Sequence, residues 1–334
     1  MDTETIGTLL FLYTETPLHA GSDTSLGAVD LPLQRERMSN LPLVQSSGVK
    51  GSLREIFRNR RNENSQALTV ALFGPEPPSG AAMSGEEADK AITHAGALSI
   101  GDARLLLLPV RTVFGGWAWT TCPLTLSRIV RDWECVGKKA PSWYGKAEAS
   151  LLDDPKVLGL VSKSSRIISP NNRLLIEDTE YPVLPNDVVG ELATWLAENA
   201  LPQTPSYEPF RKRLAEQLVI LNDEEFAFLC QHGTEVVTRI RIDPQTGTVA
   251  KGTLWTEENL PAESLLWSLG LLYRRPAPKK KDGSQSPAVK PFELADMFGK
   301  FTEVMKQGGR IRLGGGRTIG RGMLSVRLSE GVIR

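Results

Sequence analysis

The pattern of apolar residues near the N-terminus predicts that a buried strand opens the fold. Residues 6–14 read IGTLLFLYT, an apolar run rich in leucine. Thr16 and Pro17 end this run, because proline and the residue before it disfavour regular structure. A second apolar run, ALSIGDARLLLLPV, predicts strand structure over residues 97–110.

After residue 45 the apolar residues recur with the spacing of a helix. Val49, Leu53 and Phe57 recur on one face of a helix, and Ser46 and Ser47 stand before them where an N-cap is expected. Basic side chains fall on a neighbouring face of the same helix at spacings of four and three, namely Lys50, Arg54, Arg58 and Arg61. This stripe could contact phosphates.

Similar patterns predict further elements toward the C-terminus. Helices are expected from Pro123 to about Cys135, after a capping Asn186, and over residues 292–306. Two strands around the turn at 243–247 predict a protruding β-hairpin, which we place at residues 235–255. A strand and a helix in the N-terminal part, with a helix and a strand in the C-terminal part, indicate a single α+β domain over residues 1–334, of the ferredoxin-like kind.

Two segments have the composition of insertions rather than core elements. Residues 75–95 are small, polar and rich in Pro and Gly, and residues 274–291 are basic and rich in Pro and Ser. We expect both to be flexible, although the second could instead act as a tail that binds nucleic acid.

Composition excludes several classes of protein. The chain has 334 residues, 40% of them hydrophobic, so it can form a real core. No apolar run is long enough to cross a bilayer, and the start of the chain lacks the pattern of a secretory signal, so we expect a cytoplasmic protein without a membrane partner. The three cysteines have neither metal-type spacing nor the even count of a disulfide framework.

The net charge of zero hides an uneven distribution. Residues 30–61 carry seven Lys or Arg against three acids, and residues 300–334 carry eight against two. Residues 174–200 carry six acids and no Lys or Arg. A basic surface and an acidic one could therefore coexist, and the alternative is a set of solvated faces on a neutral protein.

A glycine-rich loop lies close to the C-terminus, in GGGRTIGRG at residues 314–322. It lacks the Gly-Lys-Ser/Thr of a phosphate-binding P-loop and opens no obvious helix, so nucleotide hydrolysis and dinucleotide binding are not supported. Backbone at Gly315 and Gly316 could approach an RNA phosphodiester closely, beside Arg317 and Arg321. A tight turn that requires positive φ explains these glycines equally well.

Side chains suited to proton transfer or metal binding gather after the first predicted strand. His19, Asp23 and Asp30 lie within twelve residues of one another. The histidine could instead be a structural hydrogen-bonding residue, and an aspartate in such a loop is often a turn former.

Two further acids follow the predicted hairpin. Glu257 and Glu258 could join His19 and Asp30 in space, or they could begin a helix that Thr256 caps. Motifs of zinc proteases and acyl-transfer enzymes are absent from the sequence.

Together these motifs resemble a known family. TPLHAGS and GAVDLPLQRE at residues 16–22 and 27–36, followed by LPLVQSSGVKGSLR, resemble the backbone subunit of the type III-B (Cmr) CRISPR effector complex in the RAMP superfamily. RIRID, GTLWTEENLP and the terminal GGRTIGRG are similar to later motifs of the same family. The sequence departs from the family pattern at Gln45, where Pro-Gly is more frequent, and at Asn259, where an aromatic residue is common.

The resemblance implies a fold, partners and an activity. The fold would be a modified RNA-recognition motif, with several copies stacked along a CRISPR RNA beside other type III-B subunits. The complex would bind a single-stranded target RNA and cleave it at six-nucleotide intervals. Asp30 matches the catalytic aspartate of the family, His19 and the Glu257-Glu258 pair match positions associated with the same reaction, and Lys50 and Arg54 match the helix that grips the guide.

The implied chemistry is consistent with the residue types. The 2′-hydroxyl of RNA is the nucleophile, so the protein needs to align it and to stabilise developing charge. An aspartate with an ordinary pKa of about 3.9 is a poor base for an alcohol, so we expect Asp30 to hold Mg²⁺ or Mn²⁺ near the scissile phosphate. We expect the guide phosphates to contact residues from the helix and the glycine loop: Ser46, Ser47, Lys50, Arg54, Gly315, Gly316, Arg317 and Arg321.

Two alternatives stay open at this point. The chain could be a non-catalytic RNA-binding scaffold of a type III complex. It could also be a ribonuclease that processes CRISPR precursors with His19 as general acid or base and no metal.

Overall fold

The computed structural model describes residues 4–22, 27–60, 63–75, 94–152, 154, 156–274 and 292–333. Most of the two predicted insertions, 75–95 and 274–291, lies outside the described residues, as does Asp23.

One large mixed sheet organises the described chain. β1 lies between β14 and β12, and the order continues through β4, β5, β9, β6 and β8 to β7. Neighbours are antiparallel except for the pairs β5–β9 and β6–β8. In chain order its strands are β1 (Thr5–Thr14), β2 (Leu43–Val44), β3 (Leu98–Ile100), β4 (Ala103–Arg111), β5 (Trp117–Thr121), β6 (Gly159–Val161), β7 (Arg173–Ile176), β8 (Thr179–Pro185), β9 (Leu218–Leu221), β12 (Leu265–Tyr273), β13 (Arg310–Arg312), β14 (Met323–Leu328) and β15 (Val332–Ile333).

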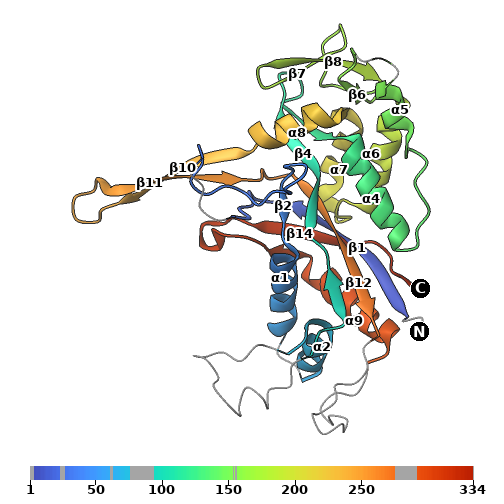
Figure 1. The fold of residues 1–334 in the computed structure, drawn as a ribbon, viewed down its shortest axis with the longest axis vertical. Helices are drawn as coiled ribbons and strands as arrows, with labels where there is room; N and C mark the ends of the chain where they lie inside the picture. The colour runs from blue at the N-terminus through green and yellow to red at the C-terminus, as the bar shows by residue number, and fades with distance from the viewer. Residues whose placement is uncertain are drawn as a thin grey trace.

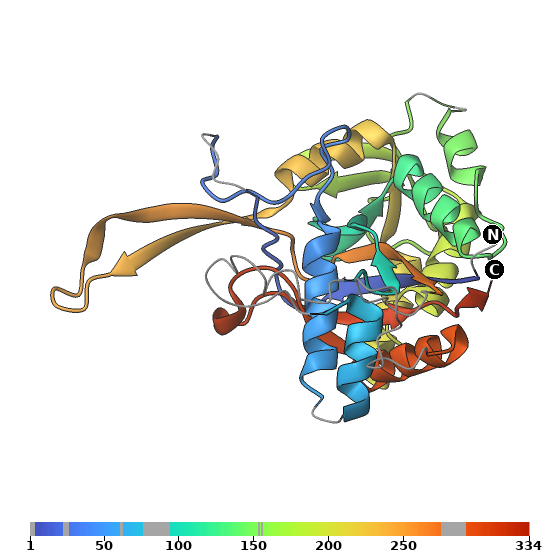
Figure 2. The ribbon, with the colours of Figure 1, turned by 60° about the horizontal axis from the view of Figure 1, so that its bottom comes forward.

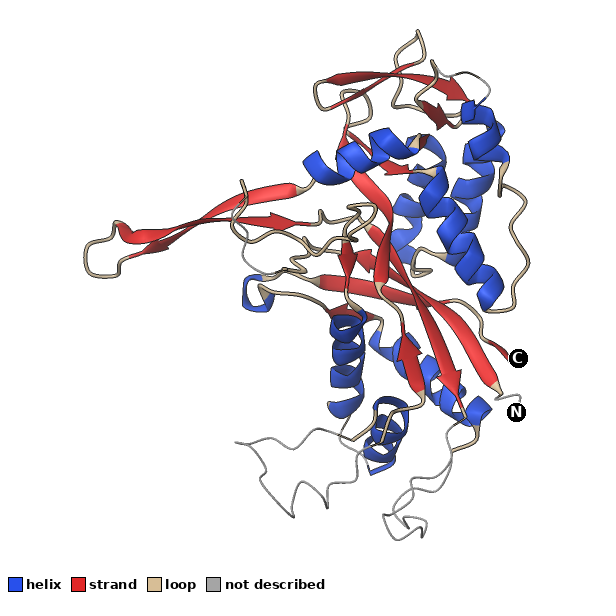
Figure 3. Cartoon of the chain, viewed as in Figure 1, coloured by secondary structure: helices blue, strands red, loops and turns tan. Residues whose placement is uncertain are grey.

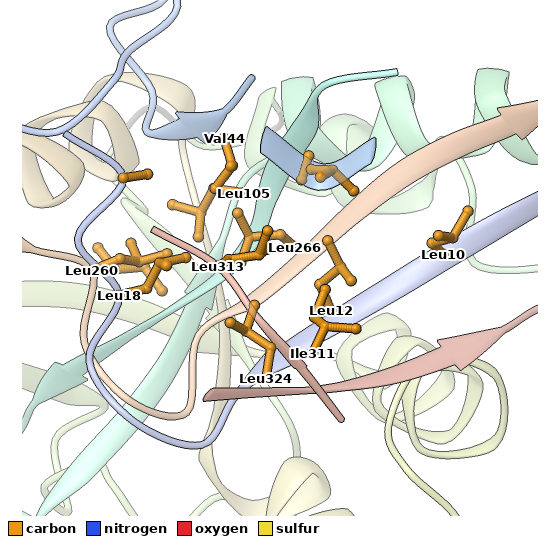
Figure 4. Packing of buried hydrophobic residues seen from close by; sticks show 14 of the residues in the cluster. Leu10, Leu12, Leu18, Val44, Leu105, Leu260, Leu266, Ile311, Leu313 and Leu324 are labelled. Atoms are coloured by element: carbon orange, nitrogen blue, oxygen red, sulfur yellow. The ribbon is translucent and has the colours of Figure 1, made fainter. Parts of the chain in front are cut away.

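The strand β1 is buried on both faces, which explains its nearly continuous apolar sequence. Leu10 and Leu12 belong to one hydrophobic cluster, while Leu9, Phe11 and Tyr13 belong to a second cluster on the opposite face. Figure 4 shows Leu10 and Leu12 packed in the first cluster. The alternation follows from the two-residue period of a strand.

Helices cover both faces of this sheet (Figures 1 and 3). Helices α1, α2 and α9 bury their apolar sides in the first cluster, whereas α4, α5, α6 and α7 bury theirs in the second. The helices are α1 (Ser46–Arg58), α2 (Glu63–Phe73), α4 (Pro123–Cys135), α5 (Lys146–Leu152), α6 (Asp187–Asn199), α7 (Glu208–Gln217), α8 (Asp223–His232) and α9 (Leu294–Gly308), with short 3-10 turns η1 (Pro205–Tyr207) and η2 (Arg317–Ile319). The α+β class predicted from the sequence is confirmed.

Several predicted helix boundaries agree with the structure. Pro123 is the first residue of α4, and Cys135 is its last. The side chain of Asn186 caps α6 by accepting a hydrogen bond of 3.0 Å from the backbone N–H of Val188. In α1, Val49, Leu53 and Phe57 are buried as their helical spacing predicts.

A separate two-stranded hairpin projects from the body, as Figures 1 and 2 show. It consists of β10 (Glu235–Ile242) and β11 (Val249–Asn259), which pair antiparallel from Glu235 and Asn259 at the base. Val236, Ile240 and Leu254 are exposed large apolar residues on this hairpin. Since a two-stranded ribbon is marginally stable alone, its geometry depends on how its base is held.

Candidate functional site

The base of the hairpin is tied to the loop that follows β1. Leu18 and Leu260 exchange two backbone hydrogen bonds of 2.9 Å each, and both side chains are buried. Figure 4 shows them close to Leu313, which leads into the glycine-rich loop. Three segments far apart in the sequence therefore meet here. We call this unit the hairpin base, and it comprises residues 17–21, 30–35, 256–260 and 313–322.

Asp30 lies exposed at the hairpin base, with its carboxylate held by Thr256. The backbone N–H and the hydroxyl of Thr256 both donate to Oδ2 of Asp30, at 2.7 and 2.9 Å. These bonds, the backbone one first, lower the pKa of Asp30 below its usual value. The side chain is therefore an anion at neutral pH and is fixed in direction.

The backbone around Asp30 pairs with β11 as a short parallel bridge. The N–H of Leu31 donates to the carbonyl of Thr256, and the N–H of Glu258 donates to the carbonyl of Leu31, both at 3.0 Å. These bonds fix the position of Asp30 relative to the hairpin.

The two glutamates do not lie in a loop after the hairpin, and they do not begin a helix. Both belong to strand β11, which extends to Asn259. The sequence-based boundary at residue 255 was too early, because the cross-strand pairs Val237–Glu257 and Val236–Glu258 continue the ladder. Thr256 accordingly acts as a hydrogen-bond donor to Asp30 and caps no helix.

Glu258 is buried and saturated with internal hydrogen bonds. Its carboxylate accepts a bond of 2.5 Å from Arg35, one of 2.7 Å from the Thr234 hydroxyl, and one of 2.9 Å from the N–H of Leu33. Only 6% of its side chain is exposed. This arrangement assigns Glu258 a structural role and argues against the catalytic role predicted for it.

Glu257 is also buried, between two arginines. Its Oε1 accepts a hydrogen bond of 2.7 Å from Arg321, and its Oε2 lies 3.5 Å from Nε of Arg239. The negative charge of Glu257 is therefore balanced inside the protein. Arg35 and Arg239 lie in the motifs GAVDLPLQRE and RIRID, but nothing in their local pattern reveals that each pairs with a glutamate of β11.

His19 packs at the centre of the hairpin base. Its Nδ1 lies 2.7 Å from the backbone carbonyl of Glu258 and 4.0 Å from Oε1 of Glu257. A carbonyl oxygen can only accept, so Nδ1 carries a hydrogen and Nε2 is the nitrogen left to accept a proton. A Cβ added at Gly21 would lie 2.6 Å from Nε2, so a larger residue there would require the ring to shift.

The glycine-rich loop fits closely around the backbone of His19. Gly315 donates a hydrogen bond of 2.9 Å to the carbonyl of His19. Gly314 has φ +72°, and a Cβ there would lie 2.2 Å from the same oxygen. Gly316 has φ +70°. The turn itself therefore requires the positive φ of Gly314 and Gly316. An RNA contact at Gly315 and Gly316 stays a prediction.

The start of α1 is capped differently from the sequence prediction. Gln45 is the N-cap and makes no capping hydrogen bond with its side chain, so Ser46 and Ser47 are inside the helix. The N–H of Ser46 instead donates to Oδ1 of Asp102 at 2.8 Å. The prediction that Ser46 or Ser47 caps the helix is wrong, because Asp102, from another segment, accepts the hydrogen bond at the start of the helix.

The predicted phosphate ligands differ in how available they are. Arg54 binds the backbone carbonyls of Gly74 and Pro75, at the end of α2. Lys50 is partly exposed on α1. Arg317 is 42% exposed and forms an ion pair of 2.8 Å with Glu55, which is 40% exposed. Such an exposed pair is weak, so Arg317 can exchange Glu55 for a phosphate.

Asp30 is the side chain here best suited to hold a divalent cation. Within the described residues no group of three or more His, Cys, Asp or Glu is arranged to hold a metal. A magnesium ion bound by one carboxylate, water and substrate phosphates needs no such group. An exposed, ionised Asp30 fits that kind of site, and Glu257 and Glu258 are engaged elsewhere.

The chain matches the model of a known protein family over most of its length. A model of the RAMP superfamily matches residues 11–325. The chain belongs to the RAMP superfamily. This membership agrees with the motifs in the sequence, and the whole hairpin base lies inside the matched range.

Two relatives of this RAMP chain match it over nearly the full length. A Pyrococcus furiosus protein named CRISPR system Cmr endoribonuclease Cmr4 is 32% identical over 323 residues, which cover 96% of this chain and 95% of that protein. A Saccharolobus solfataricus protein named CRISPR system CMR subunit Cmr4 is 25% identical over 330 residues, covering 95% and 94%.

Solved structures show the same fold. Oligomeric Cmr4 from Pyrococcus furiosus superposes with a TM-score of 0.65 at 23% identity, covering 97% of this chain and 98% of that one. A chain of a type III-B Cmr-beta complex bound to cognate target RNA gives a TM-score of 0.66 at 17% identity, covering 96% of both chains.

In the described part of this RAMP chain, no helix has the length and hydrophobicity that a bilayer crossing requires.

Proposed function

We propose that this RAMP chain is a backbone subunit of an RNA-guided complex, which binds a CRISPR RNA along its phosphates and cleaves paired target RNA. The 32% identical relative that is named a Cmr endoribonuclease supports this, because the match covers 96% of the chain. The structural neighbours support assembly with further copies and with target RNA, since they are described as oligomeric Cmr4 and as a Cmr-beta complex bound to such RNA.

The observation that carries the cleavage proposal is the placement of Asp30. Its carboxylate is exposed, ionised and held in one direction by Thr256 at the base of a projecting hairpin. An anion with a lowered pKa is a weak base, so proton abstraction from the 2′-hydroxyl is not its best role. Holding a cation beside the scissile phosphate suits it better.

A divalent cation, Mg²⁺ or Mn²⁺, bound through Asp30 and RNA phosphate oxygens would supply positive charge to the phosphate that is attacked. The protein residues would supply alignment. Asp30 fixes the site relative to the hairpin, and His19 Nε2 is the nitrogen at the hairpin base that can hold or move a proton.

The hairpin, residues 235–259, would act as the wedge that distorts the guide and target duplex. In-line attack by the 2′-hydroxyl forms a bond to phosphorus while the bond from phosphorus to the 5′-oxygen breaks. This requires an RNA geometry that a regular duplex does not adopt, so a local distortion beside Asp30 would select the cleaved bond. One hairpin per stacked copy would repeat the distortion at a regular spacing, and we propose that this spacing is the six nucleotides that the family resemblance implies.

The guide would be held through its backbone, without base preference. The partly exposed Lys50 and the exposed Arg317 are the cations best placed for this, on α1 and on the glycine-rich loop next to it. Phosphate contacts of this kind give affinity and register, while base pairing reads the target.

The test is a product ladder from the assembled complex. Particles that contain this chain and a defined guide are incubated with end-labelled complementary RNA, with Mg²⁺, with Mn²⁺ and with EDTA. The proposal predicts products at regular six-nucleotide spacing with either metal and none in EDTA. Activity in EDTA on unprocessed repeat RNA would instead favour the precursor-processing alternative.

A second candidate is a scaffold that binds RNA without cutting it. The observation that favours it is that the described residues contain no group of three or more metal-binding side chains, at Asp30 or elsewhere. Intact target in every metal condition, with guide binding preserved, would decide for the scaffold.

A further inference from the structure

Arg321 is enclosed by the protein, although its sequence context predicts a phosphate ligand. Its side chain is only 12% exposed. One guanidinium nitrogen donates to Oε1 of Glu257 at 2.7 Å and also to the amide oxygen of Asn259. Both acceptors lie at the end of β11, so the guanidinium points into the hairpin base.

The glycine-rich loop is folded around the Arg321 side chain. A Cβ at Gly316 would lie 3.1 Å from Cδ of Arg321, and the N–H of Arg321 donates to the carbonyl of Gly316 at 3.2 Å. The next residue, Gly322, donates to the carbonyl of Pro17 at 2.9 Å. The loop therefore fixes the arginine on both sides of its Cα and directs it at β11.

The acceptors of Arg321 are themselves held in place. Asn259 is fully buried, and its side-chain amide donates to the backbone carbonyl of Glu257 at 3.2 Å. Arg239 lies 3.5 Å from the second oxygen of Glu257. Asn259 therefore offers Arg321 a buried amide oxygen that is fixed in position.

We propose that Arg321 is a positioning residue that clamps the hairpin to the glycine-rich loop, and that it does not bind guide phosphate. Thr256, which holds Asp30, directly precedes Glu257 in β11. Loss of the clamp leaves the Glu257 charge poorly compensated in a buried site, and the strand that carries Thr256 loosens. The expected effect on cleavage rests on the proposed function, whereas the effect on the hairpin does not.

The first experiment measures the hairpin directly. Amide hydrogen exchange of the full chain is compared for wild type, Arg321→Met, Arg321→Lys, Glu257→Gln and the double variant Arg321→Met with Glu257→Gln. Exchange at residues 235–237 and 257–259 should be faster in Arg321→Met and intermediate in Arg321→Lys, which keeps the charge without the forked donor. Because both residues act as one unit, the double variant should exchange no faster than the worse single variant. Unchanged exchange in Arg321→Met, or additive effects in the double variant, would overturn the proposal.

The second experiment measures guide-RNA affinity against salt concentration. Arg317→Met is the matched control, because Arg317 lies in the same loop but is exposed. It should reduce the slope of log K against log salt by about 0.7 if one phosphate contact is lost. Arg321→Met should leave the slope unchanged, and a reduction equal to that of Arg317→Met would show that Arg321 binds phosphate.

Single-turnover cleavage in the assembled complex links the clamp to the activity. Arg321→Met should cut saturating target roughly tenfold or more slowly, with partial recovery in Arg321→Lys. If wild-type complexes do not cut at all, the proposed function fails, and hydrogen exchange and the salt slope still decide on the clamp. If wild-type complexes cut and Arg321→Met cuts at the wild-type rate, the clamp has no part in positioning the site.

Discussion

Thr256 donates two hydrogen bonds to a single oxygen of Asp30, 2.7 Å from its backbone N–H and 2.9 Å from its hydroxyl. The two residues are 226 positions apart in the sequence. Their contact joins the loop after β1 to the hairpin, and it makes the acid both ionised and fixed in direction. The same contact therefore holds the hairpin base together and orients the carboxylate that we propose binds the cation.

The Thr256 hydroxyl should extend cleavage to lower pH. Its bond lowers the pKa of Asp30, so the active anion persists as pH falls. Thr256→Val removes this bond but keeps the stronger contribution of the backbone N–H, so the pKa should rise only part of the way to its ordinary value. A pH profile of single-turnover cleavage should show the acidic limb moved to higher pH. An acidic limb at the wild-type position would show that Asp30 does not govern it.

The Glu258 network should contribute strongly to stability. Glu258→Ala leaves Arg35 without its carboxylate partner at a site where the arginine side chain is 16% exposed, so unfolding in denaturant should become easier by about 3 kcal/mol. Lys212→Met is the matched control, because Lys212 forms an exposed pair with Glu208, and it should cause no measurable change. Equal midpoints for the two variants would contradict the structural role of Glu258.

Two glycines of the terminal loop should respond differently to alanine. Gly314 and Gly320 both have left-handed backbone, φ +72° and +83°, but only at Gly314 would a Cβ meet another atom within 4 Å, the carbonyl oxygen of His19 at 2.2 Å. Gly320→Ala should cost about 1 to 2 kcal/mol from backbone strain alone. Gly314→Ala should cost clearly more, which thermal unfolding of both variants can measure. Equal losses would mean that the loop does not pack on His19 as described.

Glu263 should make stability depend on pH near neutrality. Burial raises its pKa to about 7, although the Tyr13 hydroxyl donates a hydrogen bond to it. Because the folded pKa is above the ordinary value, ionisation favours the unfolded state, and stability falls as pH rises from about 4.5 toward 7. Glu263→Gln should remove this fall, so its stability relative to wild type should be greater at pH 8 than at pH 5, by an amount that solvent screening at this partly exposed site reduces. The same difference at both values would contradict the raised pKa.

The elements that were predictable from sequence are those with a local cause. The burial of Val49, Leu53 and Phe57 in α1 follows from helical spacing, and the cap of α6 follows from Asn186. The short strands β6 and β7 were missed, because three or four residues are too few to show a period.

The candidate site was predictable only in part, because long-range partners decide what each side chain can do. Sequence motifs brought His19, Asp30 and Glu257 to notice, and the structure places all three at the hairpin base. That Glu257 is neutralised by Arg321 depends on a contact across 64 positions, which no local pattern contains. The bond between Asp102 and Ser46 also joins residues far apart in the sequence, so no local pattern predicts it.

Replacement of Asp30 by asparagine tests the central claim most directly. The Asp30→Asn side chain would keep its size and could still accept a hydrogen bond from Thr256, but it would lose the charge that we propose holds the cation. Guide affinity and particle assembly are measured beside single-turnover cleavage of complementary RNA. The account predicts intact assembly, unchanged guide affinity and no detectable cleavage at any site of the ladder. Cleavage at the wild-type rate and spacing in particles with Asp30→Asn would contradict it.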